Sequence, residues 1–424
     1  MISELKIRNF KSLESVDLKL GHFNLLVGAN ASGKSNFLDA LRFLQGVGNG
    51  FNLEEILDGK PASSTSLKWD GIRAGTKFVA FRKPDGTLSE TNEFHVTFKG
   101  VGLFNFSVDE LTYNLTFSVK DGAPSIAIES LYSGNKTIIG EENRLNLESL
   151  PVEEFGLPES DTPMDGPEEY EIFPESSPQV LALLARTPRI AHWGHGQFQL
   201  EESFKSADYV SANLADMQFL DPMPAVLRNY SSKVARLGEL GEGFAALIHE
   251  IESNGSKPAL LEWLKELRPD EVDDIYALKG LVNDYMVSVR EGNKEFLAPA
   301  LSDGTLRFIA LAAAFFQPSM PKILVIEEIE KGLHPSRLRL LLELMRSQSK
   351  RTGTQVFATT HSPTLLAWLN EEDRKTTFVC TRDAESGATK MRSLAEIPRF
   401  EELLENGSHI DELFAEGWLE SAPQ

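Results

Sequence analysis

The sequence predicts an α/β fold with a β-rich N-terminal part and a helical insertion. Three observations carry this prediction. Apolar runs of strand length alternate with helix-like periodicity near the N-terminus and again from about residue 295 to the end. Alternating runs separated by turn signals fill residues 76–129. Residues 178–290 show mainly helical periodicity, with amphipathic pieces such as PALLEWLKELR.

The elements follow in order along the chain. Strands are predicted at residues 4–10, 15–20 and 23–27, the last of them running into GANASGKSN. A helix is predicted next, because Phe37, Leu38, Leu41 and Leu44 recur at helical spacing. Five further strands are predicted from KFVAFR, EFHVTFKG, FNFSV, LTYNLTFSV and PSIAIESL, with PDG and KDG as turns.

Composition divides the chain into three expected parts. Residues 1–135 form an N-terminal lobe, residues 136–290 an acidic loop plus the helical insertion, and residues 291–424 a C-terminal lobe. Within the middle part, residues 141–175 are rich in acids and prolines, with Arg144 as the single base. A solvated segment is expected there, and a partner-docking or DNA-mimicking loop is the alternative.

The net charge, the cysteine content and the lengths of the apolar runs limit the classes of function that the chain can have. The 424 residues carry a formal net charge of −21, which argues against a general nucleic-acid-coating role. Cys380 is the one cysteine, so an intrachain disulfide is impossible. We interpret Cys380 as a small residue in a buried strand. No run approaches the roughly 18 apolar residues that span a bilayer, and the N-terminus lacks a signal-peptide core. A cytoplasmic protein without membrane contact is expected.

The segment GANASGKS, from Gly28 to Ser35, matches the phosphate-binding pattern G-x-x-x-x-G-K-[ST] between a predicted strand and a predicted helix. Its glycines let backbone N–H groups point inward at phosphate oxygens, and the helix presents its positive end to the same anion. Lys34 is expected to reach the β- and γ-phosphates of a nucleotide, and Ser35 to ligate Mg²⁺.

A second motif, ILVIEEIEKGLHP, begins at Ile323 and places two adjacent carboxylates at the end of an apolar strand. A magnesium–nucleotide site needs one carboxylate near the metal and another group to orient the attacking water. Glu327 is expected to serve the metal, directly or through water, and Glu328 to polarise the water. Simple emergence of the strand at the surface is the plain alternative.

Together GANASGKS, LSDGTLRF, ILVIEEIEKGLHP and ATTHSP resemble ABC-type ATPases, most closely the RecF/SMC-like branch that includes the ATPase part of OLD nucleases. The N-terminal IRNFKSL resembles the opening strand of that branch. The resemblance covers residues 1–45 and 295–370 well and implies an ABC-type P-loop ATPase head. It implies a homodimer that sandwiches two ATP molecules, with Leu301–Gly304 as the signature that caps the nucleotide of the other subunit.

The resemblance also implies roles for single residues. His361 matches the switch histidine that senses the γ-phosphate, and residues 331–335 match the D-loop at the dimer seam. Catalysis is thus assigned to Glu328 and His361, and metal binding to Ser35 and Glu327. The candidate nucleotide-binding residues are Gly28, Ala29, Asn30, Ala31, Ser32, Gly33, Lys34, Ser35, Asn36, Arg8, Lys11, Ser302 and Gly304.

Two departures from the family pattern stand out. The metal-site Asp of the family is Glu327 here, which puts direct coordination in doubt. The Q-loop glutamine has no candidate, because no Gln occurs between Gln45 and Gln179, and slow ATP hydrolysis is therefore expected.

The insertion lacks sustained heptads, so a compact lobe is expected rather than long arms. The 61 residues after TTHSP are expected to be too few for the nuclease domain of OLD proteins. The resemblance then implies an ATPase that controls a separately encoded nuclease or toxin, often in antiphage defence. A RecF-like DNA repair clamp and a nucleotide-stabilised scaffold with little hydrolysis are the alternatives. Direct DNA contact is expected to be weak and limited to Lys68, Arg73, Lys77, Arg82 and Lys83.

Overall fold

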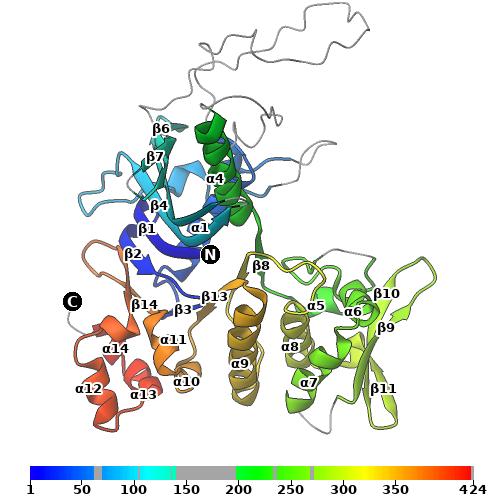
Figure 1. Ribbon diagram of the computed structural model, residues 1–424. Helices are drawn as coiled ribbons and strands as arrows, with labels where there is room; N and C mark the ends of the chain where they lie inside the picture. The colour runs from blue at the N-terminus through cyan, green and yellow to red at the C-terminus, as the bar shows by residue number, and fades with distance from the viewer. Residues whose placement is uncertain are drawn as a thin grey trace, which may run out of the picture.

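The computed structural model describes residues 1–61, 69–103, 106–134, 136–139, 197–232, 236–267 and 272–421. Two six-stranded sheets and one three-stranded sheet form its framework (Figure 1). The acidic segment 141–175 and Lys68 lie outside the described residues. The α/β class and the β-rich N-terminal lobe predicted from the sequence are confirmed.

The N-terminal lobe is an antiparallel sheet in the order β2-β1-β4-β5-β6-β7. Its alternating apolar residues make each strand one-sided, as expected where one face is buried. The strands are β1 (Ile2–Phe10), β2 (Leu13–Lys19), β4 (Asn92–Leu103), β5 (Phe106–Lys120), β6 (Ala123–Ser133) and β7 (Lys136–Ile139).

The central sheet has the order β15-β14-β3-β13-β12-β8 and is parallel except for the β14–β15 hairpin. Three of its interior strands, β3, β13 and β12, are buried at every position, which is typical of strands covered on both faces. The strands are β3 (Phe23–Val27), β8 (Met217–Leu220), β12 (Ile323–Ile326), β13 (Gln355–Thr360), β14 (Thr377–Arg382) and β15 (Thr389–Ser393).

The central sheet separates two hydrophobic cores. Leu324 and Ile326 of β12 enter one core, whereas Ile323 and Val325 enter the other, as the two-residue period of a strand requires. The same alternation holds in β3, where Leu25 and Leu26 belong to different cores.

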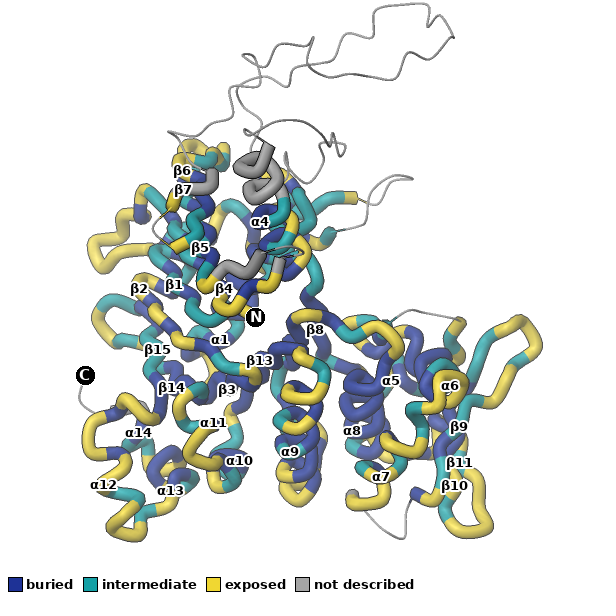
Figure 2. Tube along the Cα trace, viewed as in Figure 1, coloured by how far each residue is buried: buried dark blue, intermediate teal, exposed yellow. Residues whose placement is uncertain are grey.

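Helices fill both cores. Helices α1 (Lys34–Gly48) and α4 (Gln197–Ala215) pack between the central sheet and the N-terminal sheet. Helices α8 (Asp303–Ala313) and α9 (Pro335–Thr352) pack on the opposite face, and α8 is buried along its length (Figure 2).

Smaller elements complete the fold. A sheet of β9 (Asp274–Lys279), β10 (Tyr285–Glu291) and β11 (Lys294–Leu297) packs against α6. The remaining helices are α2 (Leu53–Asp58), α5 (Pro224–Leu227), α6 (Phe244–Ser253), α7 (Lys257–Leu267), α10 (Pro363–Leu366), α11 (Glu371–Lys375), α12 (Phe400–Glu405), α13 (Ile410–Ala415) and α14 (Trp418–Ser421), with 3-10 turns at Thr76–Phe78, Ala298–Ala300 and Leu394–Glu396.

The structure differs from the sequence prediction in three places. KFVAFR is a 3-10 turn followed by single bridges from Ala80 to Phe10 and from Arg82 to Leu88, because the end of β1 twists away through left-handed residues and cannot extend the ladder. FNFSV and LTYNLTFSV are one strand, β5. Within the predicted helical insertion, residues 217–220, 274–279 and 285–291 are instead strands β8, β9 and β10, and IYALK and YMVSV have the two-residue period of strands.

Four phenylalanines form the centre of the N-terminal core. The ring of Phe43 stacks on Phe94 at 4.8 Å and on Phe117 at 5.0 Å, and Phe10 lies 5.8 Å away. All four are completely buried.

Among the described residues no helix combines the length and the apolar character that a membrane crossing requires.

We expect Phe43→Ala to lower the free energy of unfolding by about 3–5 kcal/mol, because it leaves a large cavity between three rings. Urea denaturation measures this loss. Phe78→Ala is the control, since Phe78 is 60% exposed and removal of its ring leaves no cavity. Equal losses for the two variants would contradict the packing described.

Candidate active site

The loop from Gly28 to Ser35 joins β3 to α1 and curls through left-handed residues, with φ of 64° at Ala31 and 102° at Gly33. Such turns let successive N–H groups face one concavity. Two contacts require glycine: a Cβ at Gly28 would collide with the carbonyl oxygen of Cys380, and one at Gly33 with Thr389.

Lys34 is the first residue of α1, and its amine lies over this loop. The Nζ atom donates to the carbonyl oxygens of Gly28 at 2.6 Å and Ala29 at 2.8 Å. The first turn of α1 contains no acidic residue, so its N-terminal positive end is not neutralised there. The loop therefore combines a cation and a helix N-terminus, as an anion site requires.

Polar side chains surround this loop. The Ser32 hydroxyl is buried and has no hydrogen-bond partner among the described residues. Asn36 donates to Ser12 at 2.6 Å, and Ser12 lies 2.7 Å from Thr389. These bonds tie the start of α1 to β15. The structure thus gathers residues 28–36 of the predicted set.

Ser35 and Glu327 meet at the end of the central sheet. The Ser35 hydroxyl donates to a carboxylate oxygen of Glu327 at 3.3 Å. A hydroxyl beside a carboxylate is an oxygen-donor pair that suits Mg²⁺, which is usually held by one or two protein groups together with phosphates and water. The described part of the chain contains no group of three or more His, Cys, Asp or Glu side chains arranged to hold a metal ion.

Glu328 adopts a left-handed backbone conformation with φ of 47°, which is uncommon for a residue other than glycine. Its N–H donates to the Thr359 hydroxyl at 2.9 Å, and the N–H of Ile329 donates to the Thr359 carbonyl at 3.1 Å. These bonds hold the strained turn. Because β12 ends before this turn, the side chains of Glu327 and Glu328 do not alternate between opposite faces of the sheet as strand residues do.

His361 directly follows β13, beside the end of β12. Its ring Nδ1 lies 2.8 Å from a carboxylate oxygen of Glu330, and its side chain is 45% exposed. The predicted switch histidine is therefore at the same sheet edge as Glu328.

The structure adds Arg73 to the site, a residue that the sequence analysis placed in a DNA-facing patch. Its guanidinium donates to Asp39 at 2.9 Å and to the carbonyl of Ser35, and lies 3.8 Å from Glu327. Asp39, which is 3% exposed, also pairs with Lys11 at 2.5 Å. Burial lowers the pKa of Lys11, and Asp39 partly offsets this.

This Lys11–Asp39–Arg73 cluster borders the phosphate loop, as Lys11 was expected to do. Arg8 is instead bonded to Asp17 on β2 at 2.9 Å and to the carbonyl of Val16. No local sequence pattern around Arg73, in the segment IRAG, indicates that this arginine belongs to the site. Only the folded structure, in which Arg73 contacts residues of α1, identifies it.

The predicted signature lies at the start of α8. Ser302 is the N-cap of that helix and accepts from the Thr305 N–H at 3.1 Å. Gly304 packs directly on the carbonyl of Gly332, so the signature and the D-loop are adjacent within one chain. Asp303 pairs with Arg228 at 2.5 Å.

Arg307 joins the signature helix to the carboxylate turn. This side chain is 2% exposed and donates to the carbonyls of Glu327 at 3.0 Å and Glu328 at 3.1 Å. It also pairs with Asp221 at 2.7 Å, and Lys331 binds the same carboxylate at 2.9 Å. Partial burial raises the pKa of Asp221, but the bonds from Lys331 and Arg307 outweigh it and leave that pKa below its usual value.

Cys380 lies beneath the phosphate loop in β14. Burial raises the pKa of its thiol to about 12, so the thiol stays protonated at neutral pH. The expectation of a small buried strand residue is confirmed.

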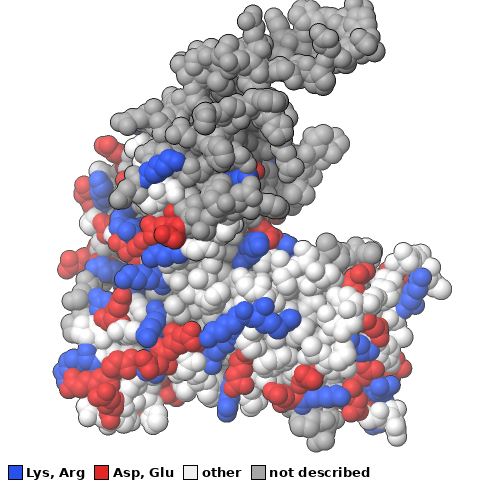
Figure 3. All heavy atoms as spheres, in the orientation of Figure 1, with Lys and Arg blue, Asp and Glu red and all other residues white. Residues whose placement is uncertain are grey.

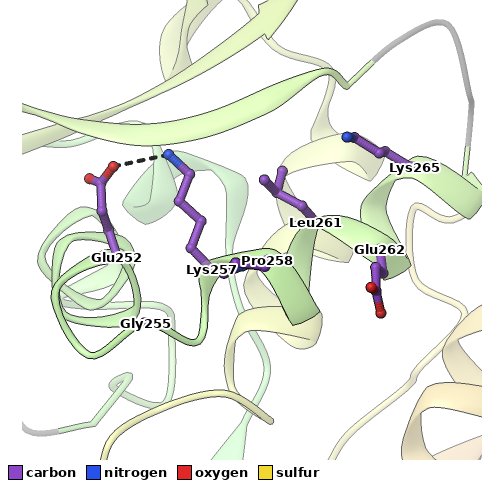
Figure 4. A pocket seen from close by; sticks show the side chains of 7 residues that line it. All are labelled: Glu252, Gly255, Lys257, Pro258, Leu261, Glu262 and Lys265. Atoms are coloured by element: carbon purple, nitrogen blue, oxygen red, sulfur yellow. Dashed lines mark hydrogen bonds and ion pairs between the residues drawn. The ribbon is translucent and has the colours of Figure 1, made fainter.

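A cavity of about 540 Å³ lies away from these residues, between α6 and α7 (Figure 4). Lys257 in its lining is already paired, since it binds Glu252 and Asp274, each at 2.9 Å. The cavity therefore offers no free cation to an anionic ligand through Lys257.

The family comparison identifies the class of protein. Residues 23–367 match the family described as "AAA domain, putative AbiEii toxin, Type IV TA system". The chain belongs to this family, and with it to the ABC-type ATPases of the RecF/SMC/OLD-like branch.

Three curated relatives differ in coverage. An "ATP/GTP phosphatase" of Helicobacter pylori is 22% identical over 89% of this chain and 90% of its own length. The "Endonuclease GajA" of Bacillus cereus is 24% identical over 86% of this chain, which spans only 56% of that protein. A "DNA replication and repair protein RecF" of Pasteurella multocida is 51% identical over 12% of this chain and 14% of its own.

Among solved structures, an SMC head bound to the C-winged helix domain of ScpA aligns with 95% of this chain and 99% of its own. Its TM-score is 0.51 at 14% identity. This likeness supports the fold.

Arg307→Ala should destabilise the protein by about 3–5 kcal/mol, because removal of one partner leaves a half-buried carboxylate and three carbonyls short of donors. Chemical denaturation measures the change. Arg339→Ala is the control: Arg339 forms an exposed ion pair with Glu343 on α9, worth at most about 0.5 kcal/mol. The same midpoint for both variants would rule out a structural role for the Arg307 bonds.

Proposed function

We propose that this chain binds ATP together with Mg²⁺ and hydrolyses it slowly as an ATP-dependent switch. One observation carries the proposal. The phosphate loop, the Glu327–Glu328 pair and His361 meet at the carboxyl ends of three neighbouring parallel strands, β3, β12 and β13. Ligands of open α/β sheets bind at that edge.

Binding follows from the residues of the loop. The inward N–H groups and Lys34 hold the phosphates, and Lys34 exchanges its present carbonyl partners for phosphate oxygens. Ser35 and Glu327 would hold Mg²⁺, which offsets the charge on the phosphates. Arg73, at 3.8 Å from Glu327, adds a second cation beside them.

Hydrolysis needs a water molecule to be oriented and relieved of a proton. Glu328 supplies the carboxylate that accepts it, held by the bonds of its backbone to Thr359 and Arg307. His361 contacts the γ-phosphate from the neighbouring strand.

Two copies of the chain enclose the nucleotides, because Ser302 and Gly304 in this proposal face the γ-phosphate on the partner subunit. The N-terminus of α8 supplies the positive end that such a contact needs. Within its own chain, Gly304 packs on the D-loop at Gly332, which places signature and D-loop on one surface.

The switch acts, in our proposal, on a separately encoded nuclease or toxin in the cytoplasm, in antiphage defence. The family description names a toxin, and the match to GajA covers 56% of that endonuclease. A toxin and an endonuclease thus occur among the names of similar proteins, which supports an effector of one of these classes.

Glu328→Gln should retain ATP binding and lower kcat by about 10²–10⁴-fold, because the amide keeps the shape but cannot take a proton. Phosphate release and equilibrium nucleotide binding measure the two effects. Lys34→Ala is the matched variant that should lose binding. Turnover at the original rate in Glu328→Gln would remove Glu328 from this role.

The Glu328→Gln protein should also accumulate an ATP-dependent dimer, because hydrolysis no longer opens it. Adding Ser302→Arg should prevent the dimer and leave nucleotide binding to the monomer intact. Sedimentation velocity with and without ATP and Mg²⁺ reports both. A Glu328→Gln protein that stays monomeric with both present would contradict the sandwich.

Direct DNA binding, in the manner of RecF, is the alternative that the short match of high identity favours. The structure removes Arg73 from the expected patch, and acidic and basic side chains are interspersed on the face in Figure 3. We expect weak binding of duplex DNA that decreases steeply with salt and that Arg82→Glu with Lys83→Glu weakens. Tight, salt-dependent binding in a gel shift would favour the DNA clamp, whereas binding that ignores both salt and the charge reversal would mean that the contact lies elsewhere.

A further inference from the structure

Glu330 is a third acid in the turn after β12, and the proposed mechanism has not used it. Its side chain is 10% exposed. A carboxylate that is largely withdrawn from water is costly unless it is well hydrogen-bonded. Its partners therefore indicate why an acid is present.

Among the described residues, both polar contacts of the Glu330 side chain go to His361. One carboxylate oxygen accepts from the backbone N–H of His361 at 2.6 Å and lies 2.8 Å from Nδ1 of the same ring. Charge-assisted hydrogen bonds of this kind are stronger than neutral ones. Because one oxygen holds both the backbone and the ring, it fixes the rotation of the imidazole relative to the chain.

The other carboxylate oxygen is buried and has no hydrogen-bond partner among the described residues. Such an acceptor costs about 1–3 kcal/mol and calls for an explanation in function or in a ligand. If Glu330 served only to close the turn, a neutral side chain with one hydrogen-bond acceptor would be enough. The presence of a charged carboxylate is better explained by its contact with the His361 imidazole.

The main chain places these two residues opposite each other. The N–H groups of Glu328 and Ile329 bind Thr359, two residues before His361. Glu330 and His361 therefore follow a fixed link between the ends of β12 and β13. The same hydrogen bonds hold the backbone of Glu328. The positions of the two proposed catalytic residues, Glu328 and His361, are therefore fixed relative to each other.

We propose that Glu330 is a positioning residue that holds the His361 ring protonated at Nδ1 and leaves Nε2 as the ring atom available to the nucleotide. The neutral Nδ1–H ring and the doubly protonated ring both keep this bond. This inference rests on the proposed function in one respect, the contact of His361 with the γ-phosphate.

Kinetics test whether Glu330 acts through His361. Glu330→Ala should lower kcat by about 10–100-fold, the usual effect of losing a group that orients an active-site histidine, while KM changes little. In a His361→Ala background, Glu330→Ala should cause no further loss, because the ring that it positions is gone. Losses that multiply in the double variant would overturn the proposal.

Two further variants separate charge, shape and general surface effects. Glu330→Gln keeps an acceptor oxygen but loses the charge, so it should retain the fold and lose less activity than Glu330→Ala. Glu343→Gln is the matched control, because Glu343 forms an exposed ion pair with Arg339 on α9 and should turn over normally. Thermal unfolding of each variant shows that the comparison is made on folded protein.

A spectroscopic measurement reads the tautomer without any hydrolysis. With ¹⁵N-labelled histidine, the chain has eight imidazoles, and the signal that disappears in His361→Ala identifies His361. Two-bond ¹H–¹⁵N correlations should show a proton on Nδ1 in the original protein and a change in that pattern in Glu330→Ala. An unprotonated Nδ1, or the same pattern in Glu330→Ala, would overturn the proposal.

The two readouts also separate this inference from the proposed function. A protein that shows the Nδ1 proton but does not hydrolyse ATP would contradict the proposed function alone. A protein that hydrolyses ATP but lacks the Nδ1 proton would contradict this inference alone.

Discussion

The parallel pairing of β3, β13 and β12 is the constraint on which the site depends. Val27 pairs with Thr360 and Ile326 with Ala358, so three chain segments that are far apart in sequence leave the sheet at one edge. The phosphate loop follows the first strand, His361 the second and Glu327 the third. Each strand is buried on both faces because a core lies on either side, and the charged groups of the site stand where the strands end.

Backbone strain gathers at the same edge. Ala31 and Glu328 have positive φ values of 64° and 47°, and Asn9 and Lys11 at the end of β1 have values of 60° and 54°. Each such residue costs on the order of 1–3 kcal/mol and persists only where neighbours hold it. Thr359 supplies that restraint at Glu328, and the carbonyl of Val79 accepts from Lys11 at 2.7 Å. The well-packed sheets support a site whose own backbone is unfavourable.

Local patterns in the sequence predicted one part of this site and missed another. Lys34, Ser35, Glu327 and Glu328 stand next to the strands that carry them, so a strand followed by a polar motif was enough to place them. Arg73 and Arg307 act through contacts across 34 and 20 residues, and no spacing rule reveals such pairs. The KFVAFR segment was predicted as a strand because its composition suits one, but the turn at the end of β1 left it without a continuous partner.

Arg307 shows how the two nucleotide sites of a dimer would influence each other. It belongs to α8, whose first residues in our proposal touch the ATP of the partner subunit, and it binds the carbonyls beside the carboxylates that act on the chain's own ATP. A buried arginine with four hydrogen bonds cannot shift without moving its partners, because each broken bond leaves an unpaired group in a largely dry interior. In the proposed dimer, engagement of Ser302 on one nucleotide would thereby be tied mechanically to Glu327 and Glu328 on the other. No separate relay between the two sites would be needed, since the helix that would complete one site also holds the turn that would form the other.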